Sequence, residues 1–487
     1  MTALILREAL VDGRHVDVSI RDGMIAGIRP ASSGTGSDAE LRLEGRPLIP
    51  GLWDAHTHMT QWAMHAQRPS TFSAGSAHEA MAIMRDARHR LPEQLDDTGS
   101  PLPLVGVGFR DGLWPDAPTA ALLDQAGEGP IVVISSDLHS AWLNTAALER
   151  SGFAGHPSGL LREAEAFEAT RRINEIPDRV LDGWVDEAGQ AAAARGVVGI
   201  EDFEMTWNLG SWQRRIDRGW RHQRVAFTVY PQHLDRAIDE GLRTGTRISD
   251  LVTVGLLKLM TDGSLGTRTA YCFDPYPELL GAAAHGHLAL SPEQLAELLA
   301  RGRAAGFEAA VHAIGDQANS HALDVFDELG IRGRIEHAQL LTAADVTRFA
   351  QLGVTASVQP EHAVDDRDLA DLHWHGRTER VIPLRSLADA GVPLVFGSDA
   401  PVANLDPWIA IAAAVHRSKD DRDPWHQEQA ISVTEAVAAS VRSTIAVGQP
   451  ADLVALDADP ASADPARLRQ MPVALTLLGG DTTHSTL

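Results

Sequence analysis

The stretch that decides the fold reads LIPGLWDAHTHM, from Leu48 to Met59. An apolar run ends here in two histidines, His56 and His58, which are separated by one threonine. If the run is a strand, residues i and i+2 point to the same side, so both imidazoles face one way. Two imidazoles so placed can bind one cation, although a pair of hydrogen-bonded polar residues explains the motif equally well.

Seven further apolar segments of strand length follow along the chain. They lie near residues 197–203, 225–230, 254–261, 309–313, 334–338, 354–358 and 394–398. Helical segments separate several of them: Ser291 and Gln294 form a predicted capping box, and Thr342 and Gly353 bracket another helix. With the strand near 52–58 the count is eight, and eight parallel strands with intervening helices indicate an α/β fold, the (β/α)8 TIM barrel.

The remaining segments predict the domain organisation. Residues 1–50 and 443–487 contain short alternating strands broken by Gly and Pro, which favours one small β-sandwich domain built from both chain termini. The barrel then spans 51–442, with an insertion at about 62–190 after the first barrel strand. This insertion could cap the site.

The composition of the chain indicates which class of partner it binds. The 487 residues include 42 basic and 66 acidic ones, and the net charge of −24 repels nucleic acid and anionic membranes, which favours a small-molecule substrate. No signal peptide and no membrane-spanning run is visible, so we expect a cytoplasmic protein. A single cysteine, Cys272, excludes an internal disulfide and a cysteine-rich zinc site. The sequence leaves open whether the chain forms a homo-oligomer.

Other candidate ligands recur at the ends of predicted barrel strands. His312 ends AAVH, His337 ends RIEH, and Asp399 follows LVFGS. Taken singly, each histidine could be a satisfied polar residue and the aspartate a helix N-cap. Together, four imidazoles and a carboxylate at one rim of a barrel suit zinc or a similar divalent ion.

Lys258 lies in the apolar segment VGLLKLMTDGS. A charged lysine is costly to bury, so it could pair with a carboxylate such as Asp262 or extend to solvent. Alternatively, its neutral amine could take up carbon dioxide and become a carbamate, an oxygen ligand able to bridge two metals.

Several motifs together resemble one enzyme family. DAHTHM, KLMTDGSLGTRTA, VHAIGDQA, RIEHAQ, SVQPEHA, GSDAPV and AVGQPADLVALD resemble the amidohydrolase superfamily, and specifically its YtcJ-like branch (amidohydrolase family 3), which includes N-substituted formamide deformylase. The resemblance runs in order over almost the whole chain and implies a binuclear centre, with two zinc ions per chain and an N6-carboxylated lysine. The implied ligands are His56, His58, Lys258, His312, His337 and Asp399. The stretch TQWAMHAQRPS after the histidine pair departs from the family pattern, which leaves the substrate open.

Four further residues are candidates for substrate binding. DLHSAWLNTAAL and SGLLREAEAF resemble family segments that would supply His139 and Glu163, although Glu163 could equally be a solvated helix residue. Arg268 could bind a substrate carboxylate bidentately or form a surface salt bridge. His362, near the exit of the seventh strand, completes the set.

These residues support a hypothesis of metal-dependent hydrolysis of a carbon–nitrogen bond in a non-peptide amide. A hydroxide bridging the metals would attack the carbonyl carbon, and Asp399 would act as general acid and base. The alternatives are a mononuclear-metal deaminase, a lactone or ester hydrolase, a phosphoester hydrolase, or a binder without catalysis. Deaminases of this fold commonly carry HxxE after the fifth strand, whereas residues 312–315 read HAIG.

Overall fold

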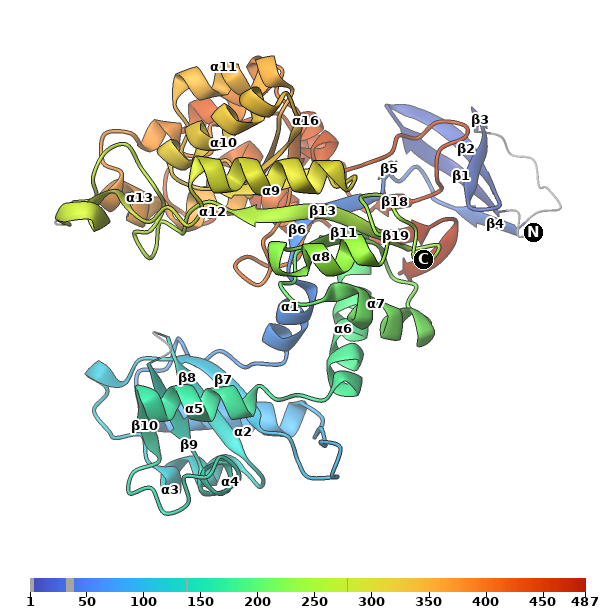
Figure 1. Ribbon diagram of the computed structural model, residues 1–487. Helices are drawn as coiled ribbons and strands as arrows, with labels where there is room; N and C mark the ends of the chain where they lie inside the picture. The colour runs from blue at the N-terminus through green and yellow to red at the C-terminus, as the bar shows by residue number, and fades with distance from the viewer. Residues whose placement is uncertain (1–3, 32–38, 137–138, 278) are drawn as a thin grey trace. The chain divides into compact units, whose positions relative to one another are not determined.

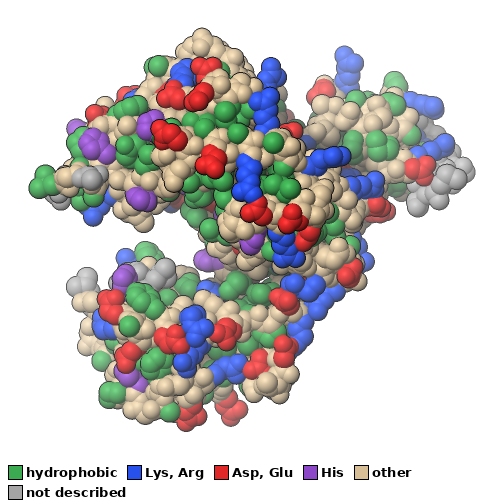
Figure 2. Space-filling view, in the orientation of Figure 1, with side chains coloured by type: hydrophobic (Ala, Val, Ile, Leu, Met, Phe, Trp, Pro, Cys, Tyr) green, Lys and Arg blue, Asp and Glu red, His purple; other side chains and the backbone are tan. Residues whose placement is uncertain are grey.

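The computed structural model describes residues 4–31, 39–136, 139–277 and 279–487 (Figure 1). The chain splits into two compact units, one formed by Met1–Met59 with Gly189–Leu487 and the other by Thr60–Ala188. No helix in these ranges is long and apolar enough to cross a membrane. Acidic and basic side chains intermingle over the face drawn in Figure 2.

The first unit contains an eight-stranded parallel sheet in the order β17-β16-β15-β14-β13-β12-β11-β6. Its strands are β6 (Leu52–Thr57), β11 (Val197–Asp202), β12 (Arg224–Val229), β13 (Val252–Met260), β14 (Ala309–Ala313), β15 (Gly333–His337), β16 (Thr355–Val358) and β17 (Leu394–Phe396). Two hydrogen bonds just beyond these strands join the first to the last: Asp399 N donates to His56 O at 2.7 Å, and His58 N donates to Ala400 O at 2.9 Å. The predicted α/β barrel is therefore confirmed.

Helices follow the barrel strands in the alternation typical of this fold. They are α7 (Asn208–Asp217), α8 (Pro231–Asp239), α9 (Pro292–Ala304), α10 (Asp316–Leu329), α11 (Ala343–Leu352), α12 (Pro360–Asp365), α13 (Arg367–His373), α14 (Leu384–Asp389), α15 (Pro407–His416) and α16 (Val433–Ala438). Helices α9, α10 and α11 lie side by side in Figure 1. The predicted caps are present, since Ser291 and Gln294 form the capping box of α9, and Thr342 and Gly353 bound α11.

Two further four-stranded sheets come from the chain termini. One contains β1 (Leu4–Val11), β2 (Arg14–Arg21), β3 (Met24–Pro30) and β4 (Ala39–Arg42); the other contains β5 (Leu48–Pro50), β18 (Leu453–Leu456), β19 (Val473–Leu478) and β20 (Asp481–Ser485). Leu6 and Val18 of the first sheet share one buried core with Leu453 and Leu475 of the second. Blue and red strands therefore meet in Figure 1, and the two ends of the chain build one sandwich.

The second unit is built on a four-stranded sheet in the order β10-β9-β8-β7. It contains α2 (Ala77–Arg90), β7 (Leu104–Phe109), α3 (Ala120–Leu123), β8 (Ile131–Ser135), β9 (Ser140–Leu143), α4 (Thr145–Arg150), β10 (Leu160–Arg162) and α5 (Ala164–Ile173), together with most of α1 (Met59–Ala66) and of α6 (Asp178–Ala193), which cross its boundaries along the chain. Ile131 and Val133 belong to one core cluster, whereas Val132 and Ile134 belong to another. Because successive side chains on a strand point to opposite faces, both faces of this sheet are covered.

Candidate metal centre

The seam that closes the barrel brings the histidine pair next to Asp399. Gly397 makes this close approach possible, because a Cβ atom there would lie 2.6 Å from the backbone nitrogen of His56. Across the seam, Asp399 Oδ1 lies 3.6 Å from His56 Nε2 and 3.3 Å from His58 Nε2. The first and last strands of the barrel thus supply three ligand-type side chains to one point.

Two groups of potential ligands share this aspartate. The ligand atoms of His56, His58 and Asp399 lie within 4.8 Å of one another, and so do those of His337, His362 and Asp399. His337 ends β15 and His362 lies on α12; their rings are stacked, with centroids 6.3 Å apart. Each group offers nitrogen and oxygen donors from three side chains, a number and chemistry that zinc and similar cations accept in catalytic sites.

Unpaired nitrogen atoms show that these residues fit a divalent ion. His337 Nδ1 and His362 Nε2 are buried and have no hydrogen-bond partner among the residues described. Buried polar atoms in proteins are nearly always paired, so atoms left without a partner point to a ligand. An ion at this position would provide the partner that the surrounding protein does not.

The backbone is strained at two of these residues. His337 has φ 71° and Asp399 has φ 54°, in the left-handed region that side chains other than glycine seldom adopt. Such strain costs about 1–3 kcal/mol per residue and clusters at functional sites. Both residues lie where the chain leaves the sheet: His337 at the end of β15, and Asp399 in the segment after β17.

Electrostatics favour the metal-binding protonation state at three of these residues but not at His58, where the contact with Asp399 outweighs burial and raises the pKa. Burial, with the charge of Lys258, lowers the pKa of His56 to about 4, and burial beside His312 lowers the pKa of His337. Burial opposes ionisation of Asp399, yet the neighbouring histidines hold its pKa well below the usual range. Neutral imidazoles and an ionised carboxylate are the forms that coordinate cations.

Lys258 lies on the fourth barrel strand, β13, and is 2% exposed. Its Nζ lies 4.8 Å from the centre of the Phe203 ring and has no hydrogen-bond partner in the described part of the chain. Burial lowers its pKa to about 8. The alternative pairing with Asp262 is wrong, because that carboxylate instead accepts three backbone N–H groups from neighbouring loops.

His312 is brought close to the site, but its ligand atoms belong to neither of the two ligand groups. Its ring centroid lies 4.4 Å from that of His337, on the adjacent strand. Its Nε2, however, lies 3.2 Å from the carbonyl oxygen of Gly263 and 3.4 Å from Asp262 Oδ1. His312 would have to give up the contact with Gly263 to bind a cation through Nε2.

A buried charge network supports His56, and the sequence analysis did not identify it. Glu336 Oε2 accepts a hydrogen bond from His56 Nδ1 at 2.7 Å, which leaves Nε2 of His56 facing Asp399. Burial opposes ionisation of Glu336, but Arg334 and His56 outweigh it and lower the pKa of Glu336. Arg334 also pairs with Glu201 on β11. Because β15 is not a neighbour of β6 or β11, these contacts cross the barrel interior.

The remaining candidates for substrate binding lie in different places. His362 belongs to one of the two ligand groups. Arg268 lies half-buried in the loop after β13 with φ 57°, and no ion pair joins it to a described residue. His139 and Glu163 belong to the second unit, where they form an ion pair of 3.1 Å with side chains 55% and 71% exposed.

Comparison with known proteins identifies the family. The model of the amidohydrolase family matches residues 40–484. The chain belongs to the amidohydrolase family. This result confirms the resemblance drawn from the motifs, and it makes the protein a metal-dependent hydrolase that requires a divalent ion.

Relatives of this amidohydrolase cover nearly its full length. It is 26% identical to the putative amidohydrolase YtcJ of Bacillus subtilis, over 96% of this chain and 95% of that protein. It is 24% identical to N-substituted formamide deformylase of Arthrobacter pascens, over 91% and 89%. An uncharacterized metal-dependent hydrolase from Pyrococcus horikoshii shares the fold, with a TM-score of 0.79 and 24% identity over 96% of this chain and 99% of that one.

Proposed function

We propose that this amidohydrolase cleaves a carbon–nitrogen bond in a non-peptide amide of a small molecule, with Asp399 as general acid and base. The observation that carries the proposal is the position of Asp399 in both ligand groups, within 4.8 Å of two histidine pairs. The similarity to N-substituted formamide deformylase supports an amide as the electrophile.

The residues that would hold the metal are those of the two groups. We infer that His56, His58 and Asp399 bind one ion, with Asp399, His337 and His362 available to a second. A bound divalent ion would polarise the amide carbonyl as a Lewis acid and make an attacking water more acidic. Zinc suits this set of imidazole and carboxylate donors.

Asp399 would move one proton in each half of the reaction. Its ionised carboxylate accepts a proton from the water as the oxygen forms its bond to the carbonyl carbon. The carboxylic acid then donates that proton to the nitrogen as the carbon–nitrogen bond breaks, so that a carboxylic acid and an amine leave. Although burial opposes its ionisation, the neighbouring histidines lower the pKa of Asp399, so the carboxylate is in the ionised form that the first proton transfer requires.

We further propose that Lys258 is carboxylated on Nζ in the active enzyme. Its neutral amine would attack the carbon of carbon dioxide and release one proton, which forms a carbamate with two oxygen donors. The buried, unpartnered Nζ and its lowered pKa support this step. His312 and the carbamate would then complete a site for two ions. Metal content per chain and a carbamate signal after exposure to carbon-13-labelled bicarbonate test the proposal: two ions with the signal support it, and one ion without it contradicts it.

Substitution of Asp399 tests the reaction. Asp399→Asn should lower kcat by about 10²–10⁴-fold, since the amide cannot shuttle the proton, while most of the metal stays bound by the histidines. Turnover is measured on metal-loaded enzyme with N-formyl, N-acyl and cyclic amides, and with esters and aminated heterocycles as references. Asp464→Asn, which alters only the N-cap of α17 (Pro465–Arg469), is the matched control. Unchanged turnover in Asp399→Asn would contradict the role of Asp399 as general acid and base. A preference for aminated heterocycles or esters would show that the substrate is not an amide.

The surroundings of Asp316 favour amide hydrolysis over the deaminase alternative. Asp316 is the first acid after His312, and it is engaged elsewhere: its carboxylate accepts hydrogen bonds from Arg380 at 2.8 Å and from the backbone N–H of Phe273 at 3.0 Å. It is also only 1% exposed. No acid is therefore free at the position where a deaminase of this fold would use one.

A further inference from the structure

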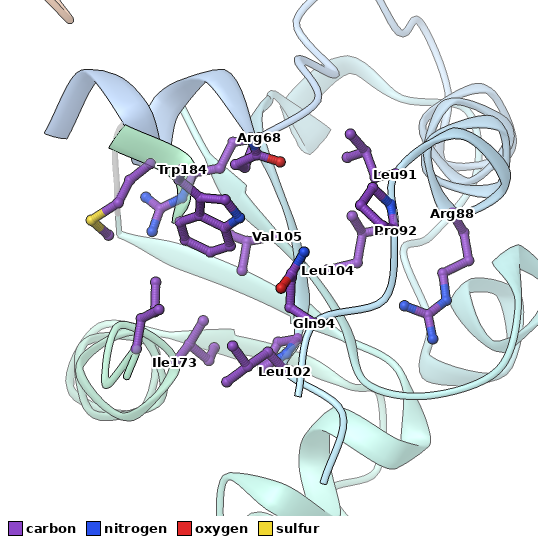
Figure 3. A pocket seen from close by; sticks show the side chains of 14 residues that line it. Arg68, Arg88, Leu91, Pro92, Gln94, Leu102, Leu104, Val105, Ile173 and Trp184 are labelled. Atoms are coloured by element: carbon purple, nitrogen blue, oxygen red, sulfur yellow. The ribbon is translucent and has the colours of Figure 1, made fainter. Parts of the chain in front are cut away.

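The second unit contains a cavity that the proposed reaction does not use (Figure 3). All its lining residues fall within Thr60–Ala188. The stretch after the histidine pair contributes Met64 and Arg68 to it, and α6 contributes Trp184. Water-sized molecules can place their centres in about 50 Å³ of it.

The cavity wall is mostly apolar. Figure 3 shows Leu102, Leu104, Val105 and Ile173 around the same space as the indole of Trp184. The four aliphatic side chains are each less than a tenth exposed, so the wall is a fixed part of the packed unit. An apolar surface of this kind favours a ligand with a hydrocarbon body.

Two hydrogen-bond donors at the cavity lack the acceptors they need. Trp184 Nε1 is buried and has no partner among the residues described. Arg68 is half-buried, and it donates to the neutral amide oxygen of Asn174 at 2.6 Å but forms no ion pair with any described residue. An unsatisfied buried donor costs about 1–3 kcal/mol, and more when it is charged. Both groups can only donate, so both require an acceptor.

The charge around the cavity points to an anion. None of its 14 lining residues is an aspartate or glutamate, although the chain carries a net charge of −24. Of its two arginines, Arg88 is neutralised by Glu93, whereas Arg68 is not neutralised by a described acid. Burial also lowers the pKa of Arg68, a cost that an anionic partner would remove.

We propose that this cavity is a second ligand site, which binds a small carboxylic acid with an aliphatic body. The carboxylate would accept hydrogen bonds from the Arg68 guanidinium and from Trp184 Nε1, and the hydrocarbon would pack against Leu104 and Ile173. An arginine fork matches a carboxylate in geometry and charge. Inorganic phosphate is a poorer match, because the apolar wall cannot satisfy its additional oxygens.

Binding of isobutyrate to the full-length, metal-loaded protein tests the site, by calorimetry and ligand-observed NMR. Isobutyramide serves as the neutral analogue of equal shape, and phosphate serves as the anion without a hydrocarbon body. We expect isobutyrate to bind about tenfold or more tightly than either, because it alone offers both an anionic acceptor and an apolar body.

Variants locate the binding. Arg68→Met keeps the aliphatic stem and should weaken isobutyrate about tenfold or more, and Trp184→Phe keeps a ring but removes the N–H and should weaken it severalfold. Arg85→Met, an exposed residue of α2 outside the cavity, is the matched control and should bind as the wild type does. Arg68→Lys, which keeps the charge but loses the fork, covers the case in which the methionine variant fails to fold.

Three results would overturn the proposal. They are absence of isobutyrate binding, binding unchanged by both Arg68→Lys and Trp184→Phe, and phosphate or isobutyramide binding as tightly as isobutyrate. Because no variant in the series touches the metal centre, hydrolytic activity can fail or survive independently of this result.

Discussion

The buried amine of Lys258 has no hydrogen-bond partner among the residues that the structure describes, and its burial costs stability. Burial lowers its pKa from 10.5 to about 8, which corresponds to about 3 kcal/mol at neutral pH. Between those pH values the unfolded chain binds more protons than the folded one, so stability of the metal-free protein rises with pH across this window. We expect Lys258→Met to stabilise the metal-free protein by up to about 3 kcal/mol at pH 7.

Urea unfolding of both proteins at pH 7, 9 and 10.5 measures this effect. The advantage of Lys258→Met should shrink above pH 8 and be nearly lost at pH 10.5. The same variant should lose metal and activity, as expected where function demands a destabilising residue. An advantage that does not depend on pH would show that packing, not the buried amine, causes the difference.

We expect Glu336 to act on the candidate metal centre through His56, as a positioning residue. Its ionised carboxylate accepts the Nδ1 proton of His56 and so fixes the tautomer whose Nε2 lone pair faces Asp399. We expect Glu336→Ala to weaken metal affinity about 10–100-fold, as measured by competition with a chelator. Glu336→Gln keeps an acceptor oxygen without the charge and should recover part of the loss. Equal metal affinity in all three proteins would contradict this role.

Several residues that lie close to the site could be predicted from the sequence. The contacts that each of them makes there were harder to predict. His56, His337 and Asp399 could be located because each ends or follows a barrel strand, and strand ends share one rim. The orientation of His312 toward Gly263 depends on a loop conformation that no spacing reveals. Glu336 was missed although a signal existed, since Arg334 and Glu336 stand two residues apart on the predicted barrel strand near 334–338 and so share one face of it with opposite charges.

At the scale of elements, the contact between the first and last barrel strands depends on a missing side chain. A Cβ atom on Gly397 would lie 2.6–2.7 Å from His56 N and Cβ, which a real Cβ contact does not tolerate. We expect Gly397→Ala to destabilise the protein by about 1–3 kcal/mol and to weaken metal binding, because the seam must open. Gly210→Ala on α7 is the control: its nearest atom lies 3.9 Å away, and it should stabilise the helix by up to about 1 kcal/mol. Thermal unfolding and metal content distinguish the two.

Most barrel elements could be predicted because their signals are local. Apolar runs of strand length indicated all eight barrel strands, and Ser291 and Thr342 predicted the N-caps of α9 and α11. The sheet of the second unit could not be assembled in this way. Its strands β9 and β10 have only four and three residues. Strands this short show no periodic pattern from which their pairing could be predicted.

At the scale of the whole molecule, the terminal sandwich makes the last residues essential to the first. Leu475 and Leu477 on β19 share a core with Leu6 and Val18, and Thr476 donates to Ala193 O at 2.8 Å. We expect deletion of residues 473–487 to abolish the folded protein, since it removes β19 and exposes this core. Deletion of 481–487 alone removes the edge strand β20 and should leave folded, less stable protein. Yields of folded protein and its melting temperature decide between them, and a stable 473–487 deletion would contradict the shared core.

The barrel seam also has a consequence for how the enzyme acquires its metal in the cell. His56 and Asp399 meet across it, yet they lie 343 positions apart in the chain. At a synthesis rate of about 5–20 residues per second, the ribosome completes Asp399 about 17–70 s after His56. During that time the nascent chain offers only part of the proposed ligand set, so we expect the metal ion to bind late in synthesis or after it.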